Sequence, residues 1–352
     1  MNTIKKNWIF LSLLLAYAAY AGIYIYQTSF VVEDVRYFVL FDDAMISMRY
    51  AKNLAEGYGL VWNPGGAPVE GYTNPLWVIW MAFFHIFPIS APKLSLAIQI
   101  SGALLLLTNL IFVKKIAASI SDRLVIPFLA VLMTAFYTPL NNWGLQGMEV
   151  SALVLLLSAA AWKLLDDLQN EKFTPWPYLI LGFSTLVRID MAVSYLVILG
   201  FALLFIPQYR RQHILWGLGS LVFFIAIQTI FRLWYYGEPV PNTFYLKMGG
   251  LSLIQRLKRG VLVLYDFLWD MNWVLFLLPF IFVALKRDRQ SILLALLVAG
   301  QITYSVYVGG DAWEHKGGAN RYIALALPLF FVLFSLALDQ IVQAVSQNLE
   351  KI

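Results

Sequence analysis

The chain has 352 residues, of which 61% are hydrophobic and 13% charged, with a formal net charge of +5 and no cysteine. Soluble domains average about 45–50% apolar and about 25% charged residues, so the composition predicts a polytopic membrane protein and excludes a string of soluble domains. The lack of cysteine excludes disulfides and thiolate chemistry. The positive charge lies in short clusters at the ends of apolar runs, which is typical of membrane orientation signals and not of nucleic-acid binding.

An apolar run at the N-terminus, from Trp8 to about Gln27, follows Lys5 and Lys6. It is longer than the hydrophobic core of a signal peptide and ends without a small-residue cleavage site. We therefore expect a retained helix with a cytoplasmic N-terminus. About 20 apolar residues cross a bilayer core of about 30 Å, and several runs meet this length. The predicted spans are 8–28, 94–113, 213–231, 291–308 and 321–342, with shorter ones at 124–140, 150–165 and 272–285.

The run 176–206 is interrupted by Arg188 and Asp190. A charge at mid-membrane costs about 2.5–3.5 kcal/mol, so we expect a hairpin with this pair at its outer tip. Pro75–Pro88 would be roughly 21 Å long as a helix, which is too short to span, and is expected to lie in the membrane interface. With the basic clusters in the cytoplasm, about ten spans and two cytoplasmic termini result. The clusters are Lys114, Lys115 and Arg123; Arg210 and Arg211; and Lys286, Arg287 and Arg289.

The sequence thus predicts one all-α transmembrane domain over residues 1–352, without a soluble C-terminal domain. Its longest outer segments, 28–93 and 232–271, are expected to be periplasmic loops, the first with interfacial helices. The polar segments gather on the outer face in this topology, so a functional site is expected to face outward. They are Asp42–Asn74, Asn141–Glu149, Arg232–Lys247 and Gly309–Arg321, with Arg188 and Asp190 beside them.

Two adjacent carboxylates, Asp42 and Asp43, open the first polar segment. Residues 44–56 after them are predicted to form an amphipathic helix in the membrane plane, with Arg49 on its polar side. It is expected to end at Gly57. One of the two Asp residues is a candidate N-cap, and the other is then free to act as a base or as an oxygen ligand of a divalent ion.

Further acidic and polar residues lie on the same face. Glu70, Tyr72 and Asn74 suit hydroxyl-rich ligands, although turn chemistry alone accounts for the Asn, Gly and Pro of this stretch. Glu149 lies at the outer start of a span, where the helix dipole also stabilises a carboxylate. Arg188 and Asp190 either form a structural ion pair or set a cation near an anionic ligand.

The last polar segments carry aromatic and basic residues. Tyr236 belongs to an aromatic group that the interfacial belt can explain, whereas Asn242 lies in a proline-fixed stretch that is more specific than a belt requires. Lys247 ends that stretch. A final cluster puts cations where a lipid phosphate would sit, with snorkelling as the alternative for its Arg. This cluster comprises Asp311, His315, Lys316 and Arg321.

The sequence contains no Walker loop, HExxH, GxSxG or paired-Cys motif. Their absence excludes NTPase, zinc-protease and serine-hydrolase chemistry of those types.

An ordered series of motifs resembles the GT-C superfamily of glycosyltransferases, which use polyprenyl-phosphate sugars. The motifs are DDAMISMRYAKNLAEGYGLVWNPG, EGYTNPLW, GMEV, RID, YYGEPVPNTFYLK and GGD with a later R, from about Phe41 to Pro328. They are similar to the branch that contains the mycobacterial terminal arabinofuranosyltransferase and its Gram-negative relatives. RID departs from the RPD usual in these relatives, and their soluble C-terminal domain is not matched.

The resemblance implies a GT-C-like bundle in the bacterial inner membrane and an inverting transfer on the periplasmic face. Asp42 is the first acidic residue of the family pattern, Asp43 its partner and Glu149 a second acidic site; an Asp of the first loop is the implied general base. Cations that fall where the donor phosphate would be held are Arg188, Lys247, His315 and Arg321. The other candidate substrate-binding residues are Arg49, Glu70, Tyr72, Asn74, Asp190, Tyr236, Asn242, Asp311 and Lys316.

The implied donor is a polyprenyl-phosphate sugar, with arabinofuranose as the first choice by resemblance alone, and the implied acceptor is a glycan or a pilin-type protein. No cofactor is required; a divalent cation at Asp42 and Asp43 stays open. Two rivals remain, a lipid-linked glycan flippase or other transporter, and a non-catalytic membrane assembly protein. A transporter is expected to carry mid-span charges and repeated halves, and neither is evident in the sequence.

Overall fold

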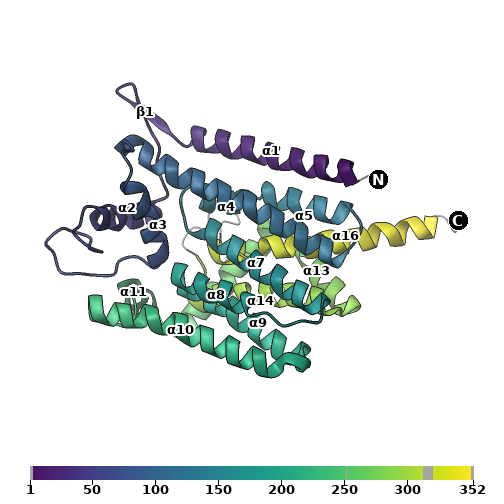
Figure 1. Cartoon of the computed structure of the whole chain (residues 1–352). Coiled ribbons are helices and arrows are strands. Elements are labelled where there is room, and N and C mark those ends of the chain that lie inside the picture. Colours follow the sequence, from purple (N-terminus) through teal and green to yellow (C-terminus); the bar gives the residue numbers. More distant parts are fainter. Residues whose placement is uncertain (1–2, 251, 312–319, 350–352) are drawn as a thin grey trace.

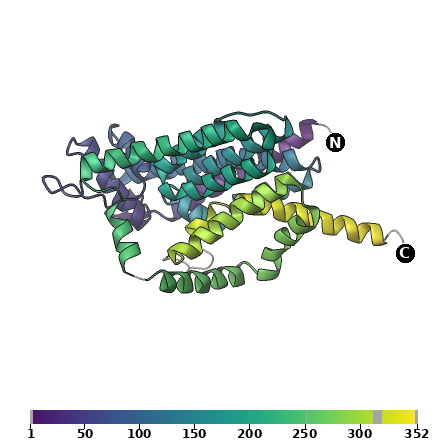
Figure 2. The ribbon, with the colours of Figure 1, turned by 90° about the horizontal axis from the view of Figure 1, so that it is seen from below.

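The computed structural model describes residues 3–250, 252–311 and 320–349. Long helices run side by side, and both ends of the chain lie at one end of the bundle (Figures 1 and 2). We call this end the terminal end, and the opposite end, where α2 and α3 lie, the polar end. The helices up to α8 are α1 Thr3–Gln27, α2 Asp42–Ala55, α3 Pro75–His85, α4 Ala91–Ile120, α5 Val125–Ala135, α6 Thr138–Leu145, α7 Val150–Gln169 and α8 Trp176–Val187. The later ones are α9 Ala192–Phe205, α10 Arg210–Tyr236, α11 Asn242–Gly249, α12 Leu253–Asp270, α13 Trp273–Lys286, α14 Arg289–Val308, α15 Arg321–Ala324 and α16 Leu327–Leu349.

The predicted all-α polytopic fold is confirmed; the described strands, β1 Phe30–Val32 and β2 Val35–Tyr37, form only a small antiparallel hairpin. Among the described residues, five helices are long and apolar enough to cross a membrane, or up to seven if two bent pairs each count as one span. The bent pairs are α5 with α6, at 54°, and α12 with α13, at 96°. The five are Trp8–Gln27, Ala91–Ile120, Pro207–Tyr236, Arg289–Val308 and Leu327–Asn348.

The predicted number of about ten spans is therefore not confirmed. Two of the predicted spans are the short helices α8 and α9, with 12 and 14 residues. The span predicted at 321–342 also begins later, because the chain breaks between α15 and α16 and the long helix starts at Leu327.

The hairpin predicted over 176–206 is confirmed. The chain turns at Arg188 and a short 3-10 helix, Ile189–Met191. A Cβ at Gly217 of α10 would lie 3.3 Å from Tyr178 and 2.5 Å from Leu199, one residue on each arm. Since these two residues lie at similar distances from the turn, the arms run back along each other against α10.

Residues 232–271 differ from the predicted loop. They contain the last turn of α10 and the whole of α11 and α12. In Figure 2 this stretch leaves α10 at the polar end and returns along α14 to α13. A Cβ at Gly260 would lie 2.2 Å from the Val306 carbonyl oxygen, so the backbones of α12 and α14 touch there. Helices that pack this closely need a small residue at the contact.

A tight corner between α6 and α7 shapes the polar end. Gly147 has φ +84°, and a Cβ there would meet Leu40 at 2.7 Å. Its carbonyl accepts a hydrogen bond from the indole of Trp77 in α3, at 2.9 Å. The corner therefore fixes Glu149, at the start of α7, against the segments around α2 and α3.

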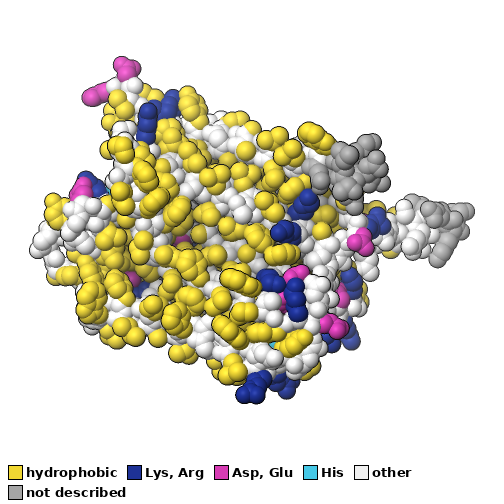
Figure 3. Space-filling model, in the orientation of Figure 1, with side chains coloured by type: hydrophobic (Ala, Val, Ile, Leu, Met, Phe, Trp, Pro, Cys, Tyr) yellow, Lys and Arg dark blue, Asp and Glu magenta, His cyan; other side chains and the backbone are white. Residues whose placement is uncertain are grey.

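The distribution of side chains on the surface also differs between the two ends of the bundle. Figure 3 shows hydrophobic side chains over most of the visible face, and most of the visible Lys and Arg lie toward the terminal end. The basic clusters at the ends of α4, α13 and the start of α10 lie at this end (Figure 1). The chain is thus a multi-pass membrane protein with its basic loops and both termini at one end.

Candidate active site

The acidic pair starts α2. Phe41 is at the N-cap position without a side-chain cap bond, and Asp42 and Asp43 are the first two helical residues. The prediction that one Asp caps the helix is therefore wrong. The Asp42 Oδ1 atom instead accepts the N–H of Asp43 at 2.8 Å. Carboxylates in a first turn are stabilised by the unpaired N–H groups and the helix dipole.

Asp43 is bound by an arginine from a distant part of the chain. Arg321 Nη1 lies 2.7 Å from Asp43 Oδ2, and Arg321 Nε lies 3.2 Å from Asp311 Oδ2. The backbone N–H of Arg321 also donates to Asp311 at 3.1 Å. Asp311 and Arg321 are buried, whereas the Asp43 side chain stays 44% exposed. Asp42 is exposed, so the structure separates the pair into a bound and an accessible carboxylate.

A second polar network starts one turn further along α2. The Ser47 hydroxyl donates to Asn74 Oδ1 at 2.9 Å, and Asn74 Nδ2 donates to Glu149 Oε2 at 2.8 Å. Glu149 Oε1 accepts from Arg188 Nη1 at 3.0 Å, and Arg188 Nε lies 3.0 Å from both carboxylate oxygens of Asp190. All five side chains except Asp190 are buried. The network joins α2, the start of α3, the start of α7 and the hairpin tip.

Tyr322 lies where the two networks meet. The guanidinium carbon of Arg188 is 5.1 Å from its ring centroid, and that of Arg321 is 5.7 Å away. Because an aromatic face attracts cations, this ring lets two like charges approach the same place. The four carboxylates of the two networks and the exposed Asp42 thus belong to one site at the polar end.

The loop between α2 and α3 is fastened to α10 by a set of contacts that we call the α10 clamp. Arg232 Nε lies 2.8 Å from Glu70 Oε2, and the hydroxyls of Tyr72 and Tyr236 are 2.9 Å apart. Leu60 N–H donates to the Tyr235 hydroxyl at 2.9 Å. Burial raises the pKa of the Glu70 carboxyl above its ordinary value, against the opposing effect of Arg232. Burial likewise raises the pKa of the Tyr72 hydroxyl.

The other predicted site residues are placed as follows. Arg49 is exposed and bonded to the loop of Trp62 and Asn63. Asn242 starts α11 with an exposed side chain, and its backbone N–H donates to the Glu70 carbonyl at 3.1 Å. The side chain of Lys247, and the whole of His315 and Lys316, lie outside the described residues.

Within the described residues, no group of three or more His, Cys, Asp or Glu is arranged so that it could hold a metal ion. The Asp43 carboxylate faces Arg321. Hard divalent ions take six or more oxygen ligands, so we derive no step through a metal.

Sequence reasoning missed three contributors. Ser47 lies four residues after Asp43, a spacing that puts it on the same helix face. Arg232 was recognised only as the basic end of a polar segment, and Tyr322 follows Arg321 directly. The helical spacing was the one signal that could have found Ser47. No local sequence pattern identifies Arg232 or Tyr322 as part of the site.

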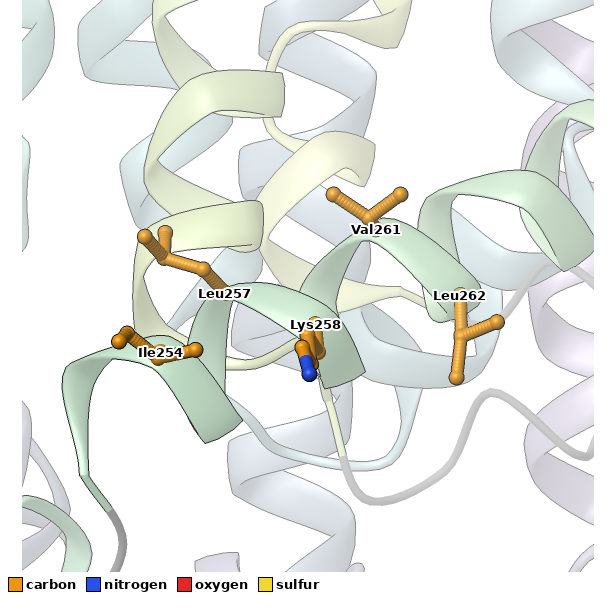
Figure 4. Close-up of a pocket in the computed structure, with 5 residues that line it drawn as sticks. All are labelled: Ile254, Leu257, Lys258, Val261 and Leu262. Carbon is orange, nitrogen blue, oxygen red and sulfur yellow. The ribbon is translucent and has the colours of Figure 1, made fainter.

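An apolar hollow of ≈ 540 Å³ lies on α12. Figure 4 shows its lining, and only Lys258 among them carries charge; the others are Ile254, Leu257, Val261 and Leu262. None of these lining residues belongs to either polar network.

No protein-family model matches the chain. It is 26% identical over 221 residues to the terminal beta-(1->2)-arabinofuranosyltransferase of Mycobacterium tuberculosis (strain ATCC 25618 / H37Rv), a match that covers 58% of this chain and 34% of that protein. The chain therefore spans about a third of the length of this relative.

A solved structure shares the fold. ArnT from Cupriavidus metallidurans, in the apo state, superposes with a TM-score of 0.60 and 13% identity, covering 94% of this chain and 59% of that one. The predicted resemblance is thus confirmed: the chain has the all-α GT-C fold of ArnT and is similar in sequence to a mycobacterial arabinofuranosyltransferase.

Proposed function

We propose that this chain is an inverting membrane glycosyltransferase that moves a sugar from a polyprenyl-phosphate donor to a glycan or protein acceptor. Arabinofuranose is the first donor sugar to test, because the sequence relative is named for it. The observation that carries the proposal is the accessible Asp42 carboxylate beside the arginine-bound Asp43, at the polar end of a GT-C-type bundle.

Asp42 is the general base of this proposal. It is exposed, and its Oδ1 accepts only the neighbouring N–H among the hydrogen bonds of the described residues. A base must come within about 3 Å of the hydroxyl that it deprotonates, and an exposed carboxylate allows that approach. Asp43 is a positioning residue, because its bond to Arg321 ties the start of α2 to the segment before α16.

Carboxylates already engage both buried arginines of the site. Arg321 contacts Asp43 and Asp311, and Arg188 contacts Glu149 and Asp190. We therefore give Arg188 and Arg321 structural roles. The donor phosphate is assigned to the predicted cations Lys247, His315 and Lys316.

The reaction then needs no nucleotide. Asp42 accepts the proton of the acceptor hydroxyl. At the same time the oxygen of that hydroxyl forms a bond to the anomeric carbon of the donor sugar, from the side opposite the phosphate. The bond between that carbon and the phosphate oxygen breaks, and polyprenyl phosphate leaves with the electron pair. Cations at the phosphate stabilise its developing charge.

The activity test uses membranes from cells that express the whole chain, with radiolabelled polyprenyl-phosphate arabinofuranose and a panel of oligosaccharide acceptors. We expect Asp42→Asn to lower transfer by about 10²–10⁴-fold, the range typical of a lost general base. The amount of protein in the membrane should not change. Asp43→Asn should lower both transfer and thermal stability. Transfer at the wild-type rate in both variants would refute the assignment, and a transporter would show no transfer in any form of the chain.

Orientation is tested with single cysteines, since the chain has none. We propose that the polar end faces the periplasm. Val69→Cys at the polar end and Asp122→Cys at the terminal end both replace exposed residues. A membrane-impermeant maleimide on intact spheroplasts should label Val69→Cys and leave Asp122→Cys unlabelled until the cells are lysed. The reverse pattern would reject a periplasmic site.

A further inference from the structure

Trp62, an exposed aromatic residue at the polar end, is fixed by several contacts with α2. Trp62 keeps 39% of its surface exposed, yet its carbonyl accepts from Arg49 Nε at 2.8 Å and from Asn53 Nδ2 at 3.0 Å. The Arg49 guanidinium lies 4.3 Å from the indole centroid, and Arg49 Nη2 donates to Asn63 Oδ1 at 2.7 Å. Two consecutive turns of α2 thus fix a side chain that is not buried.

The loop that carries Trp62 is anchored from its other side as well. Leu60 bonds the Tyr235 hydroxyl through its N–H and the Tyr236 hydroxyl through its carbonyl, both at 2.9 Å. Gly59 has φ +84°, and a Cβ there would lie 2.4 Å from the Tyr235 oxygen. The indole is therefore presented on a rigid support, which is the usual condition for a binding loop.

The position of Trp62 relates it to the candidate base. Asp42 and Arg49 are seven residues apart on α2, which puts them on one face of the helix and roughly 10 Å apart along its axis. The residues between them on that face, Met45 and Ile46, are 44% and 36% exposed. An exposed strip thus runs from the Asp42 carboxylate, over an apolar patch, to the Arg49–Trp62 pair.

The aromatic belt at the lipid surface does not account for this arrangement. Belt residues lie at the ends of membrane spans. Figure 1 shows the segment between α2 and α3 extending from the polar end beyond the end of α1. The aromatic residues of α3 are the better belt candidates, since Trp80 and Phe83 are exposed on an apolar helix.

We propose that Arg49 and Trp62 form a sugar platform that holds an acceptor glycan away from the reacting end. The platform rests on the proposed function, and it adds the class of acceptor, an oligosaccharide. The apolar face of a sugar ring packs on an indole, whose edges and neighbouring N–H groups meet the hydroxyls. With the terminal hydroxyl at Asp42, the roughly 10 Å along α2 between Asp42 and Arg49 is longer than one sugar ring, so we expect the platform to need an oligosaccharide.

The first experiment measures binding without any donor. The full chain in phospholipid nanodiscs is applied to an array of arabinan, mannan and galactan fragments, each as mono- and tetrasaccharide. We expect one tetrasaccharide to bind clearly better than its monosaccharide. Trp62→Ala should weaken that binding about tenfold, which corresponds to about 1.4 kcal/mol, and Trp62→Phe should weaken it less. Trp8→Ala, which replaces a tryptophan at the terminal end that is 63% exposed, is the control and should bind as the wild type does.

Several results would overturn the platform. They are equal binding by Trp62→Ala and the wild type, equal affinity for mono- and tetrasaccharide, or no binding to any fragment. Brominated lipids, which quench tryptophan fluorescence on contact, supply a further test. The part of the fluorescence that is lost in Trp62→Phe comes from Trp62. Quenching of that part would place the indole in lipid and overturn the platform.

The platform and the proposed function fail separately. Glycan binding that depends on Trp62 but occurs without transfer activity would keep the platform and reject the enzyme. Transfer with an acceptor KM that is unchanged in Trp62→Ala would keep the enzyme and reject the platform. If both hold, Trp62→Ala should raise the KM for the tetrasaccharide about tenfold and leave kcat, which depends on Asp42, nearly unchanged.

Discussion

The two ends of the bundle are both rich in charge, and most of their ion pairs differ in sequence separation; Arg123 with Asp339, at 3.1 Å, is a long-range exception at the terminal end. At the terminal end, Lys163 bonds Asp166 and Asp167, three and four residues further along α7, at 2.9 and 2.7 Å. Lys172 bonds Asp166 as well, at 2.9 Å. At the polar end, several partners are far apart in sequence, although Lys52 and Glu56 form a local pair there as well. Arg321 and Asp43 are separated by 278 residues, and Arg232 and Glu70 by 162.

This difference separates charges that orient a helix from charges that assemble a site. A pair at i,i+3 or i,i+4 forms as soon as its helix forms. A pair that joins α2 to the segment before α16 forms only when the bundle closes. At least one side chain of each such pair is buried, and the loss of one partner leaves an uncompensated charge in a place of low dielectric. The polar end should therefore respond strongly to single changes that the terminal end tolerates.

The largest effect is expected for Arg321→Met. The change leaves Asp43 and Asp311 without their shared cation, and Asp311 is 5% exposed. Breaking a buried pair from one side costs about 3–5 kcal/mol. Thermal unfolding of the detergent-purified chain should show a large fall in Tm, with Arg321→Lys in between. Lys52→Met removes an exposed pair with Glu56 in the same region and serves as the control. Equal Tm values for both Met variants would contradict the comparison.

A smaller effect is expected at the α10 clamp. Arg232 is 1% exposed, and its Nη1 and Nη2 atoms have no hydrogen-bond partner within the described residues. Glu70→Leu should therefore cost about 3 kcal/mol, because it strands a buried cation. The double variant Glu70→Leu with Arg232→Met should recover part of that loss, since both charges are then gone. A double-mutant cycle on unfolding free energies measures this coupling, and additive single effects would refute it.

The sequence predicted the features that depend on residues close together in the chain. Periodicity and length placed the first span, the short α3 helix and the turn at Arg188. The acidic pair was also recognised, but its relation to the helix was not. Either Asp was compatible with a cap, but both lie inside the helix, and Asp43 bonds Arg321, which no local pattern connects to α2.

The number of spans and the clamp could not be predicted for a related reason. The short helices α8 and α9 need their neighbours to cover them, so the apolar length of 176–206 does not tell how deep the turn lies. Residues 232–271 contain the whole of α12, whose packing against α14 depends on contact between Gly260 and Val306. Pairs such as Glu70 with Arg232 are chosen by packing between distant segments, and hydrophobic periodicity does not report on them.

An intermediate effect is expected for Asn74→Ala, which tests whether the second network depends on its centre. Asn74 bonds Ser47 on one side and Glu149 on the other, and it is 4% exposed. Leaving a buried partner unsatisfied costs about 1–3 kcal/mol. Asn74→Ala should therefore lower the free energy of unfolding more than Ser47→Ala, which removes only one of the two bonds. Equal losses in the two variants would mean that the bond to Glu149 contributes nothing.

The smallest effect is expected for Lys172 and Asp166 at the terminal end. Their side chains are 44% and 29% exposed, and Asp166 keeps Lys163 as a second partner when Lys172 is changed. An exposed pair contributes about 0–1 kcal/mol, and salt screens it. Lys172→Met should leave the unfolding free energy within about 0.5 kcal/mol of the wild type, and less still in high salt. A loss as large as that of Arg321→Met would show that sequence separation does not distinguish the two ends. The ion pairs of α7 would then belong to the same class as those that hold Asp43.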